Sequence, residues 1–216
     1  MDFQAEQFTR LLKNSNIPVF LTLGNHDIAA YSWKDKSRVS TQYHAEKARA
    51  TWIRNTPCFK NGTYYNKIIK AGDQTFRLIF LDDAYNSVLP GENMEIPYID
   101  KAQVHWLQKQ IEQSNDDIEI ILMHIPLKNE EGKDVPDCEL FSVLKKYSSI
   151  KLVLAGHSHK NAITPFNIED GLKIIQVQTG AFARSTENWR LIRLTGDNIF
   201  ISVPGKTENE LAIPIK

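Results

Sequence analysis

The spacing of apolar residues along the chain predicts helices that alternate with short strands. Helix-type spacing or composition is found in four ranges: 3–12, 40–54, 102–114 and 138–147. Apolar runs that predict strands are found in five ranges: 19–23, 64–70, 75–81, 118–123 and 150–155. Residues 71–74 favour a hairpin turn, and Asp100 is suited to cap the third helix. After residue 168 short β-like runs alternate with turns, so the sequence predicts an α/β fold with a mainly β tail.

Composition narrows the class of protein. The 216 residues contain 26 Lys and Arg against 26 Asp and Glu, so the chain lacks the basic excess that nucleic-acid binding needs. Hydrophobic residues at 42 % are ordinary for a globular protein, and we expect one domain over residues 1–216. No apolar run is long enough for a membrane span and the first residues lack an export signal, so as given we expect a cytoplasmic chain without a membrane partner. The spacing of Cys58 and Cys138 suggests neither a zinc knot nor a disulfide.

Three of the predicted strands end in polar tips that are rich in metal-ligating residue types. The strand at 19–23 leads into Gly-Asn-His-Asp, the strand at 118–123 into His124, and the strand at 150–155 into Gly-His-Ser-His. These tips hold His26, His124, His157 and His159, out of 6 histidines in the chain. Functional loops of α/β sheets gather at the carboxyl ends of strands, so we expect the tips to converge.

The tips offer imidazole nitrogen and amide oxygen, which a borderline divalent metal such as zinc, iron or manganese accepts. The candidate ligands are Asn25, His124, His157 and His159. Residues two apart on an extended segment face the same way, which lets His157 and His159 share one cavity. Taken singly, a strand-end histidine such as His124 is more often a hydrogen-bonded structural residue. The ordered conjunction of the three tips is the specific signal.

The three tips resemble sequence blocks of a known enzyme family. Residues 21–27 (Leu-Thr-Leu-Gly-Asn-His-Asp), 123–126 (Met-His-Ile-Pro) and 155–159 (Ala-Gly-His-Ser-His) look like the third, fourth and fifth blocks of the calcineurin-like metallophosphoesterases. The resemblance implies a four-layer α/β/β/α sandwich of the metallophosphoesterase type, here N-terminally incomplete. It also implies hydrolysis of a phosphomonoester or phosphodiester, in a small molecule or a phosphoprotein.

Carried over by position, the family's chemistry implies a role for each residue. The ligands of one ion of a two-metal centre would be Asn25, His124 and His157. His159 would ligate the other ion. His26 would bind the phosphate and protonate or stabilise the leaving oxygen, while Asp27 would orient the His26 imidazole.

Two blocks that the family carries before Gly-Asn-His-Asp, namely Asp-x-His and Gly-Asp-x-x-Asp, do not occur in this sequence. They would supply most ligands of the first ion and the carboxylate that bridges both ions. We therefore expect at most one divalent ion (Mn, Zn or Fe) to bind well, and the activity of the isolated chain to be impaired. The absent strands would leave unpaired edges and exposed apolar surface, so we expect self-association or pairing with a complementary N-terminal segment.

Two further residues could contact substrate. Asp82 ends the strand at 75–81 beside Asp83, where it could face the site, although a surface-loop role is favoured for both. Arg184 could meet the substrate phosphate, although charged loop residues are usually just solvated. Two alternatives to an enzyme that is complete in one chain stay open: a degenerate, non-catalytic member of the family that acts as a binding protein, and one half of a split enzyme.

Overall fold

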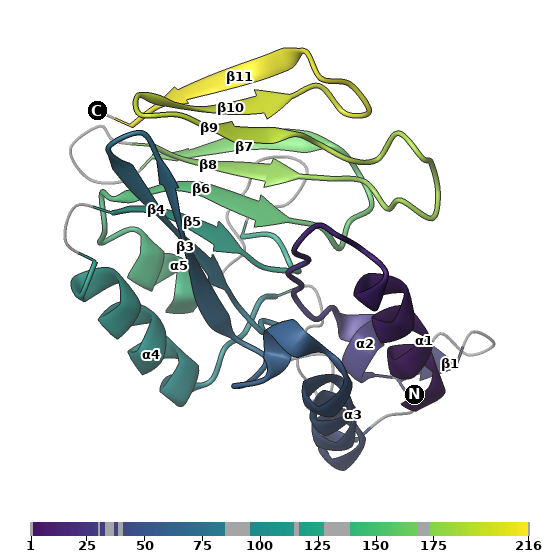
Figure 1. Ribbon diagram of the computed structural model, residues 1–216. Helices are drawn as coiled ribbons and strands as arrows, with labels where there is room; N and C mark the ends of the chain where they lie inside the picture. The colour runs from purple at the N-terminus through teal and green to yellow at the C-terminus, as the bar shows by residue number, and fades with distance from the viewer. Residues whose placement is uncertain are drawn as a thin grey trace.

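The computed structural model describes residues 2–29, 31–32, 37–38, 41–84, 96–114, 117–127, 139–167 and 173–215. Its centre is a six-stranded mixed sheet in the order β3-β4-β5-β6-β8-β7 (Figure 1). The strands are β3 Tyr65–Ala71, β4 Gln74–Phe80, β5 Ile118–Leu122, β6 Ile150–Ala155, β7 Ala162–Asn167 and β8 Lys173–Gln178. β4, β5, β6 and β8 are parallel, and β3 and β7 pair antiparallel at the edges. Because parallel strands end at the same edge, the loops after β5 and β6 are neighbours.

A second, antiparallel sheet of three strands packs on one face of the large sheet (Figure 1). It consists of β9 Ile192–Leu194, β10 Asn198–Ser202 and β11 Asn209–Pro214, in the order β11-β10-β9. The apolar cluster between the two sheets includes Phe76, Ile120, Leu152, Ile199 and Ile201. Alternate residues of each strand point to this side, as the two-residue period of a strand requires.

Two helices cover the other face of the large sheet. They are α4 Lys101–Glu112 and α5 Glu139–Leu144. The apolar cluster on this face includes Leu107, Ile111, Ile79, Ile121 and Val153. Asp100 caps α4 as predicted, because its carboxylate accepts a hydrogen bond of 2.8 Å from the Gln103 N–H.

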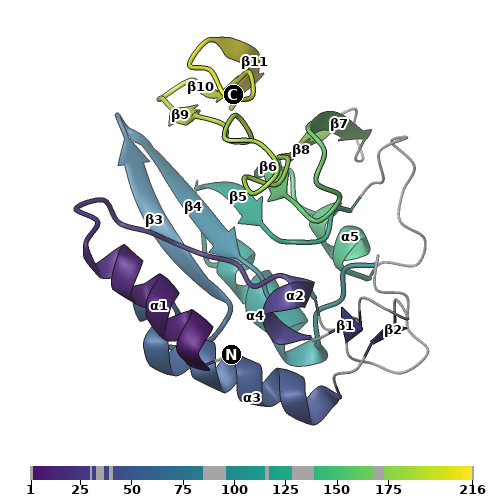
Figure 2. The same cartoon turned by 90° about the vertical axis from the view of Figure 1, so that its right-hand side faces the viewer.

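The N-terminal helices share the first face with the small sheet. The elements are α1 Asp2–Lys13, α2 Asn25–Ile28, the short strands β1 Tyr31–Ser32 and β2 Ser37–Arg38, α3 Gln42–Asn55 and the 3-10 helix Pro57–Phe59. α1 and α3 lie side by side (Figures 1 and 2). Their cluster contains Trp52 and Phe80, and Leu78 and Leu122 of the large sheet pack against both this cluster and that of the small sheet.

The predicted α/β class is confirmed, whereas the four-layer sandwich is not. The described ranges form layers in the order helices, large sheet and small sheet. Within them no helix layer covers the outer face of the small sheet, because α1 and α3 pack beside that sheet. The extent of the single domain over residues 1–216 stays a prediction.

The strand predicted at 19–23 is wrong. This segment runs across the face of the large sheet (Figure 2) and joins none of the sheets formed by the described residues. The Leu21 N–H donates to the Tyr65 hydroxyl at 2.8 Å, and that hydroxyl donates to the Leu21 carbonyl at 2.9 Å. The Tyr65 side chain thus makes the backbone hydrogen bonds that a neighbouring strand would otherwise make. Val19 and Phe20 remain 37 % and 36 % exposed.

The other predicted elements are confirmed, with ends that shift by a few residues. The helix predicted at 138–147 is shorter than expected, since α5 ends at Leu144. Cys58 is a free thiol, whereas Cys138 lies outside the described residues. Among the helices that the structure describes, none combines the length and the apolar character that crossing a bilayer requires. The cytoplasmic location stays a prediction.

A buried ion pair fastens α3 to the end of β4. Arg49 Nε lies 2.6 Å from Asp82 Oδ2, and Arg49 Nη2 lies 3.2 Å from Oδ1. The Thr63 hydroxyl also donates to Asp82 Oδ2 at 2.6 Å. Arg49 and Asp82 are 6 % and 0 % exposed, so water screens this pair little.

We expect Asp82→Asn to lower the free energy of unfolding by about 3–5 kcal/mol, because it removes the negative charge that faces the buried Arg49 guanidinium at 2.6 Å. Urea unfolding followed by circular dichroism measures the loss. Asp73→Asn makes the same chemical change in the exposed turn between β3 and β4 and should stay within about 0.5 kcal/mol of the wild type. Equal losses in the two variants would contradict a structural role for the ion pair.

Candidate metal centre

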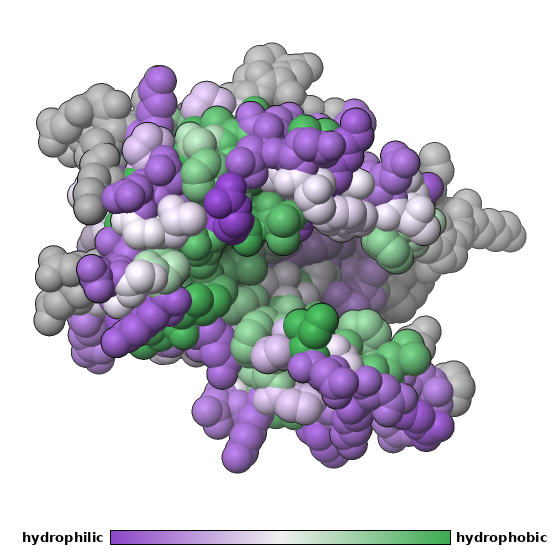
Figure 3. All heavy atoms as spheres, turned by 45° about the horizontal axis from the view of Figure 1, so that its top comes forward, coloured by the Kyte–Doolittle hydropathy of each residue, from purple (hydrophilic) through white to green (hydrophobic). Residues whose placement is uncertain are grey.

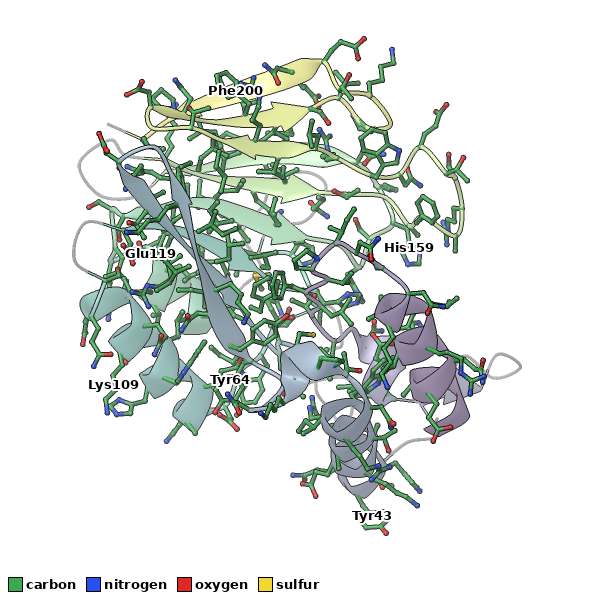
Figure 4. The ribbon with its side chains drawn as sticks, in the orientation of Figure 1. Tyr43, Tyr64, Lys109, Glu119, His159 and Phe200 are labelled. Carbon is green, nitrogen blue, oxygen red and sulfur yellow. The ribbon has the colours of Figure 1, made fainter. Side chains whose placement is uncertain are left out.

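The three polar tips meet at one edge of the large sheet. His124 follows β5, and the turn from Gly156 to His159 follows β6. These two loops are joined directly, because the Gly156 N–H donates to the His124 carbonyl at 3.0 Å. The third tip enters from the N-terminal segment and forms α2, which begins at Asn25. Figure 4 shows His159 at this edge of the sheet.

Three of the four predicted ligands place their donor atoms around one point. Asn25 Oδ1 lies 2.8 Å from His124 Nε2, and His157 Nδ1 lies 3.1 Å from the same nitrogen. The His124 and His157 rings meet edge to face, with centroids 5.0 Å apart. The predicted convergence of the tips is therefore seen in the geometry.

This donor set suits a divalent metal ion in its chemistry, and its two distances of 2.8 and 3.1 Å are close to the donor spacing around a bound ion. Imidazole nitrogens and carbonyl oxygens bind zinc-like ions at about 2.0–2.2 Å, which places neighbouring donors roughly 3–3.5 Å apart. Burial, and then the nearby imidazoles of His157, His26 and His159, lower the pKa of His124 to about 3. His124 is therefore neutral near pH 7, which is the form that ligates metals.

The set lacks an anionic ligand. In the part of the chain that the structure describes, no three side chains of His, Cys, Asp or Glu come together as a metal site, and the third donor is the amide of Asn25. Two imidazole ligands and an amide bring no negative charge, so they would leave the charge of a divalent ion uncompensated. Such a site binds more weakly than one that contains a carboxylate.

Gly24 gives the His124 ring its space. A Cβ atom at this position would lie 2.8 Å from His124 Cε1 and 2.9 Å from Nδ1. The backbone at Gly24 has φ −100° and ψ 171°, values that any residue adopts. The requirement for glycine is therefore steric and concerns the position of the imidazole.

His26 and Asp27 lie on the short helix α2. The Asp27 carboxylate accepts a hydrogen bond of 2.8 Å from the Gly24 N–H and so caps the helix. Burial raises the pKa of Asp27, while the Gly24 N–H and the charge of His26 oppose the rise. The His26 side chain is exposed. The contact of Asp27 with Gly24 differs from the expected one, and its role in orienting the His26 imidazole stays a prediction.

His159 and Arg184 lie close to each other at the rim of the site. The pKa of His159 is lowered by partial desolvation first, then by the Arg184 cation, and further by His157 and His26. The loop of Arg184 is tied to the loop of His159: the Asn161 amide donates to Asn188 Oδ1 at 3.0 Å, and Asn161 Oδ1 accepts from the Gly180 N–H at 3.0 Å. Two basic side chains thus border the cluster of the other candidate ligands.

The two aspartates after β4 are buried rather than in a surface loop as favoured. Both oxygens of Asp82 are bonded to Arg49, and its exposure is 0 %, so this geometry does not support contact with substrate. Asp83 is also 0 % exposed, and its carboxylate accepts from the His124 N–H at 2.8 Å and from the Ile125 N–H at 2.7 Å. Burial raises the pKa of Asp83 to about 7.

Asp83 therefore holds the loop that carries His124, a role that the sequence analysis missed. The signal was present in the sequence: an acidic pair directly after an apolar strand that runs next to the strand of His124. Only the parallel pairing of β4 with β5 brings the two strand ends together.

A pocket opens beside His26. It has a volume of about 450 Å³ and is lined by Phe8, Leu21, Thr22, Leu23, His26, Asp27 and Trp52. The rings of Phe8 and Trp52 meet edge to face at 6.1 Å. The surface seen in Figure 3 is hollowed, with apolar residues inside the hollow. The pocket offers an apolar wall next to an exposed imidazole.

The sequence matches the calcineurin-like phosphoesterase family over residues 2–161. This stretch covers all three tips and most of the chain, so the chain belongs to the calcineurin-like phosphoesterases. No curated protein sequence matches it.

Among solved structures, the chain is similar to a dimetal phosphatase from Danio rerio, with a TM-score of 0.61, 14 % identity, and coverage of 100 % of this chain and 78 % of that one. It is also similar to the NAD nucleotidase of Haemophilus influenzae, with a TM-score of 0.53, 14 % identity, and coverage of 99 % of this chain and 38 % of that one. At this identity the similarity shows the fold.

We expect Gly24→Ala to weaken metal binding at least about tenfold, since the new Cβ must displace the His124 ring from Asn25 and His157. Competition with a chromophoric chelator for Zn²⁺ measures the affinity. Gly156→Ala is the matched control, because its Cβ would come no closer than 3.9 Å to His124 and only to the backbone carbonyl and the edge of the ring. Unchanged affinity in Gly24→Ala would show that the ring does not need this space.

Proposed function

We propose that this chain carries out metal-dependent hydrolysis of a phosphomonoester or phosphodiester, as its family membership suggests. One observation carries the proposal: Asn25 Oδ1 and His157 Nδ1 both lie within 3.1 Å of His124 Nε2. A divalent ion held there would act as a Lewis acid towards a phosphoryl oxygen and would lower the pKa of a bound water.

The residues around this point suit the remaining tasks of phosphoester hydrolysis. His26 is exposed beside the pocket, where its imidazole can bind a phosphate oxygen and give a proton to the leaving oxygen. Arg184 lies near His159 and can offset phosphate charge. The apolar wall of the pocket, with Phe8 and Trp52, suits an organic group of a small phosphoester.

We further propose that one ion, of Mn, Zn or Fe, binds at Asn25, His124 and His157, and that His159 belongs to a weaker second site. His159 is exposed and follows His157 by two residues in the sequence. The absence of a carboxylate from the described donors favours a chain that is impaired in turnover. The same observation favours the alternative that the chain binds a metal and a phosphate ligand without catalysis.

His124→Ala should lower the affinity for Mn²⁺ or Zn²⁺ by at least about 100-fold, because it removes the donor shared by the other two ligands. His105→Ala, an exposed histidine on α4, is the control and should change nothing. Metal content by mass spectrometry and the hydrolysis of nitrophenyl phosphate mono- and diesters give two separate readings. One bound ion with turnover supports the hydrolase, and one bound ion without turnover supports the binding protein. No bound ion in the wild type contradicts both.

We also propose that a second copy of this chain covers the segment from Ile17 to Leu23. Ile17, Val19 and Phe20 are 75 %, 37 % and 36 % exposed, and the segment lies outside every sheet of the described residues. Two copies that pair this segment antiparallel about a twofold axis would bury these side chains and give the backbone a ladder. A complementary segment from another polypeptide is the competing occupant.

Light scattering coupled to size-exclusion chromatography should show a dimer whose fraction rises with concentration. Phe20→Glu should shift the chain to a monomer, because it places a charge in the apolar contact. Leu11→Glu, which adds the same charge to an exposed position of α1, should leave the dimer in place. A wild type that stays monomeric at high concentration argues against the second copy and leaves the other polypeptide as the occupant.

A further inference from the structure

Two buried glutamines connect the loops that carry the candidate ligands. Gln176 and Gln178 lie on β8, two residues apart on the same face of the sheet, and both are 0 % exposed. The Leu127 N–H, in the loop after β5, donates to Gln176 Oε1 at 2.7 Å. Gln176 Nε2 donates to Gln178 Oε1 at 3.1 Å, and Gln178 Nε2 donates to Ser158 Oγ at 2.8 Å.

The backbone fixes the direction of this relay. An N–H group can only donate, so Leu127 requires the oxygen of the Gln176 amide. The nitrogen of that amide is then directed at Gln178, which presents its oxygen in turn and points its own nitrogen at Ser158. The loop after β5 and the turn after β6 are thereby linked through a third strand.

The surroundings of the two glutamines are apolar. Ile174, on the same face of β8, belongs to the apolar cluster under α4 and α5, and Val153 of β6 pairs with Gln176 in register. A buried amide that loses its partners is costly, and an apolar side chain would fill such a position without that risk. The burial of these two glutamines is explained if their hydrogen bonds hold a part of the backbone that apolar packing does not hold.

The constrained element is the turn of the two histidines. His157 and His159 have φ values of 62° and 60°, in the left-handed region that side chains other than glycine disfavour. The Ser158 N–H donates to the Gly156 carbonyl at 2.8 Å, which closes the turn tightly. Backbone of this kind persists only where its surroundings over-determine it. Ser158, between the two histidines, is the residue that β8 holds.

We propose that Gln178, supported by Gln176, is a positioning residue for the candidate metal centre: it holds Ser158 and so keeps the left-handed turn that aims His157 at His124. The metal part of this inference rests on the proposed function. The restraint on the turn does not, because it acts in the metal-free chain as well.

Ser158→Ala and Gln178→Met in the full chain test the inference in two ways. In the metal-free protein, hydrogen exchange of the amides at 156–160 should become at least about tenfold faster, because the turn loses its anchor. Zn²⁺ affinity, from competition with a chelator, should fall about 10–100-fold, and the visible spectrum of the Co²⁺ form should change. Ser158→Thr keeps the hydroxyl that accepts from Gln178 and should match the wild type in all three measurements.

Ile174→Ala is the matched control, since it removes packing from the same face of the same strand and leaves the relay in place. It should lower the Tm without a change in exchange at 156–160 or in Zn²⁺ affinity. Wild-type exchange and affinity in Ser158→Ala would overturn the inference, even if Gln178→Met fails to fold. Faster exchange in Ser158→Ala, in a chain whose wild type binds no Zn²⁺, would support the positioning role and refute the metal function.

Discussion

The position of the His124 imidazole depends on its own backbone as much as on its ring. The Asp83 carboxylate accepts a hydrogen bond from the His124 N–H, and the Gly156 N–H donates one to the His124 carbonyl. The ring nitrogen Nε2 meets Asn25 and His157. A residue bonded at both backbone groups and at its ring has little freedom to move alone. The geometry of the candidate centre is therefore the geometry of the strand ends themselves.

Buried polar groups concentrate at this end of the sheet, where they would be expensive without partners. Asp82 pairs with Arg49, Asp83 pairs with two backbone N–H groups, and Gln176 and Gln178 pair with each other. Between the layers, by contrast, the buried clusters consist of aliphatic and aromatic side chains. Apolar packing thus sets where the strands lie, and buried hydrogen bonds set how their ends are presented.

Local patterns are sufficient to predict the candidate ligands but not the residues that support them. His124 and the Gly-His-Ser-His turn were found because apolar runs that end in ligand-type residues are visible in the sequence itself. The sequence favours a surface position for Asp83 because an acidic residue after a strand is usually solvated, whereas its burial follows from the pairing of β4 with β5. Gln176 and Gln178 resemble the polar positions of an ordinary alternating strand. The segment at 19–23 has a strand's composition, yet strand formation also needs a neighbour, which no local pattern supplies.

The left-handed backbone at His157 and His159 lowers the stability of the fold at two positions that carry an imidazole. Glycine, or to a lesser degree asparagine, would relieve about 1 kcal/mol or more at each of these φ values, so a chain released from any need for imidazole would gain by accepting either replacement. Histidine at both positions is therefore less favourable for folding than glycine would be. Random substitution followed by selection for thermal tolerance alone would therefore be expected to remove both histidines of this turn early.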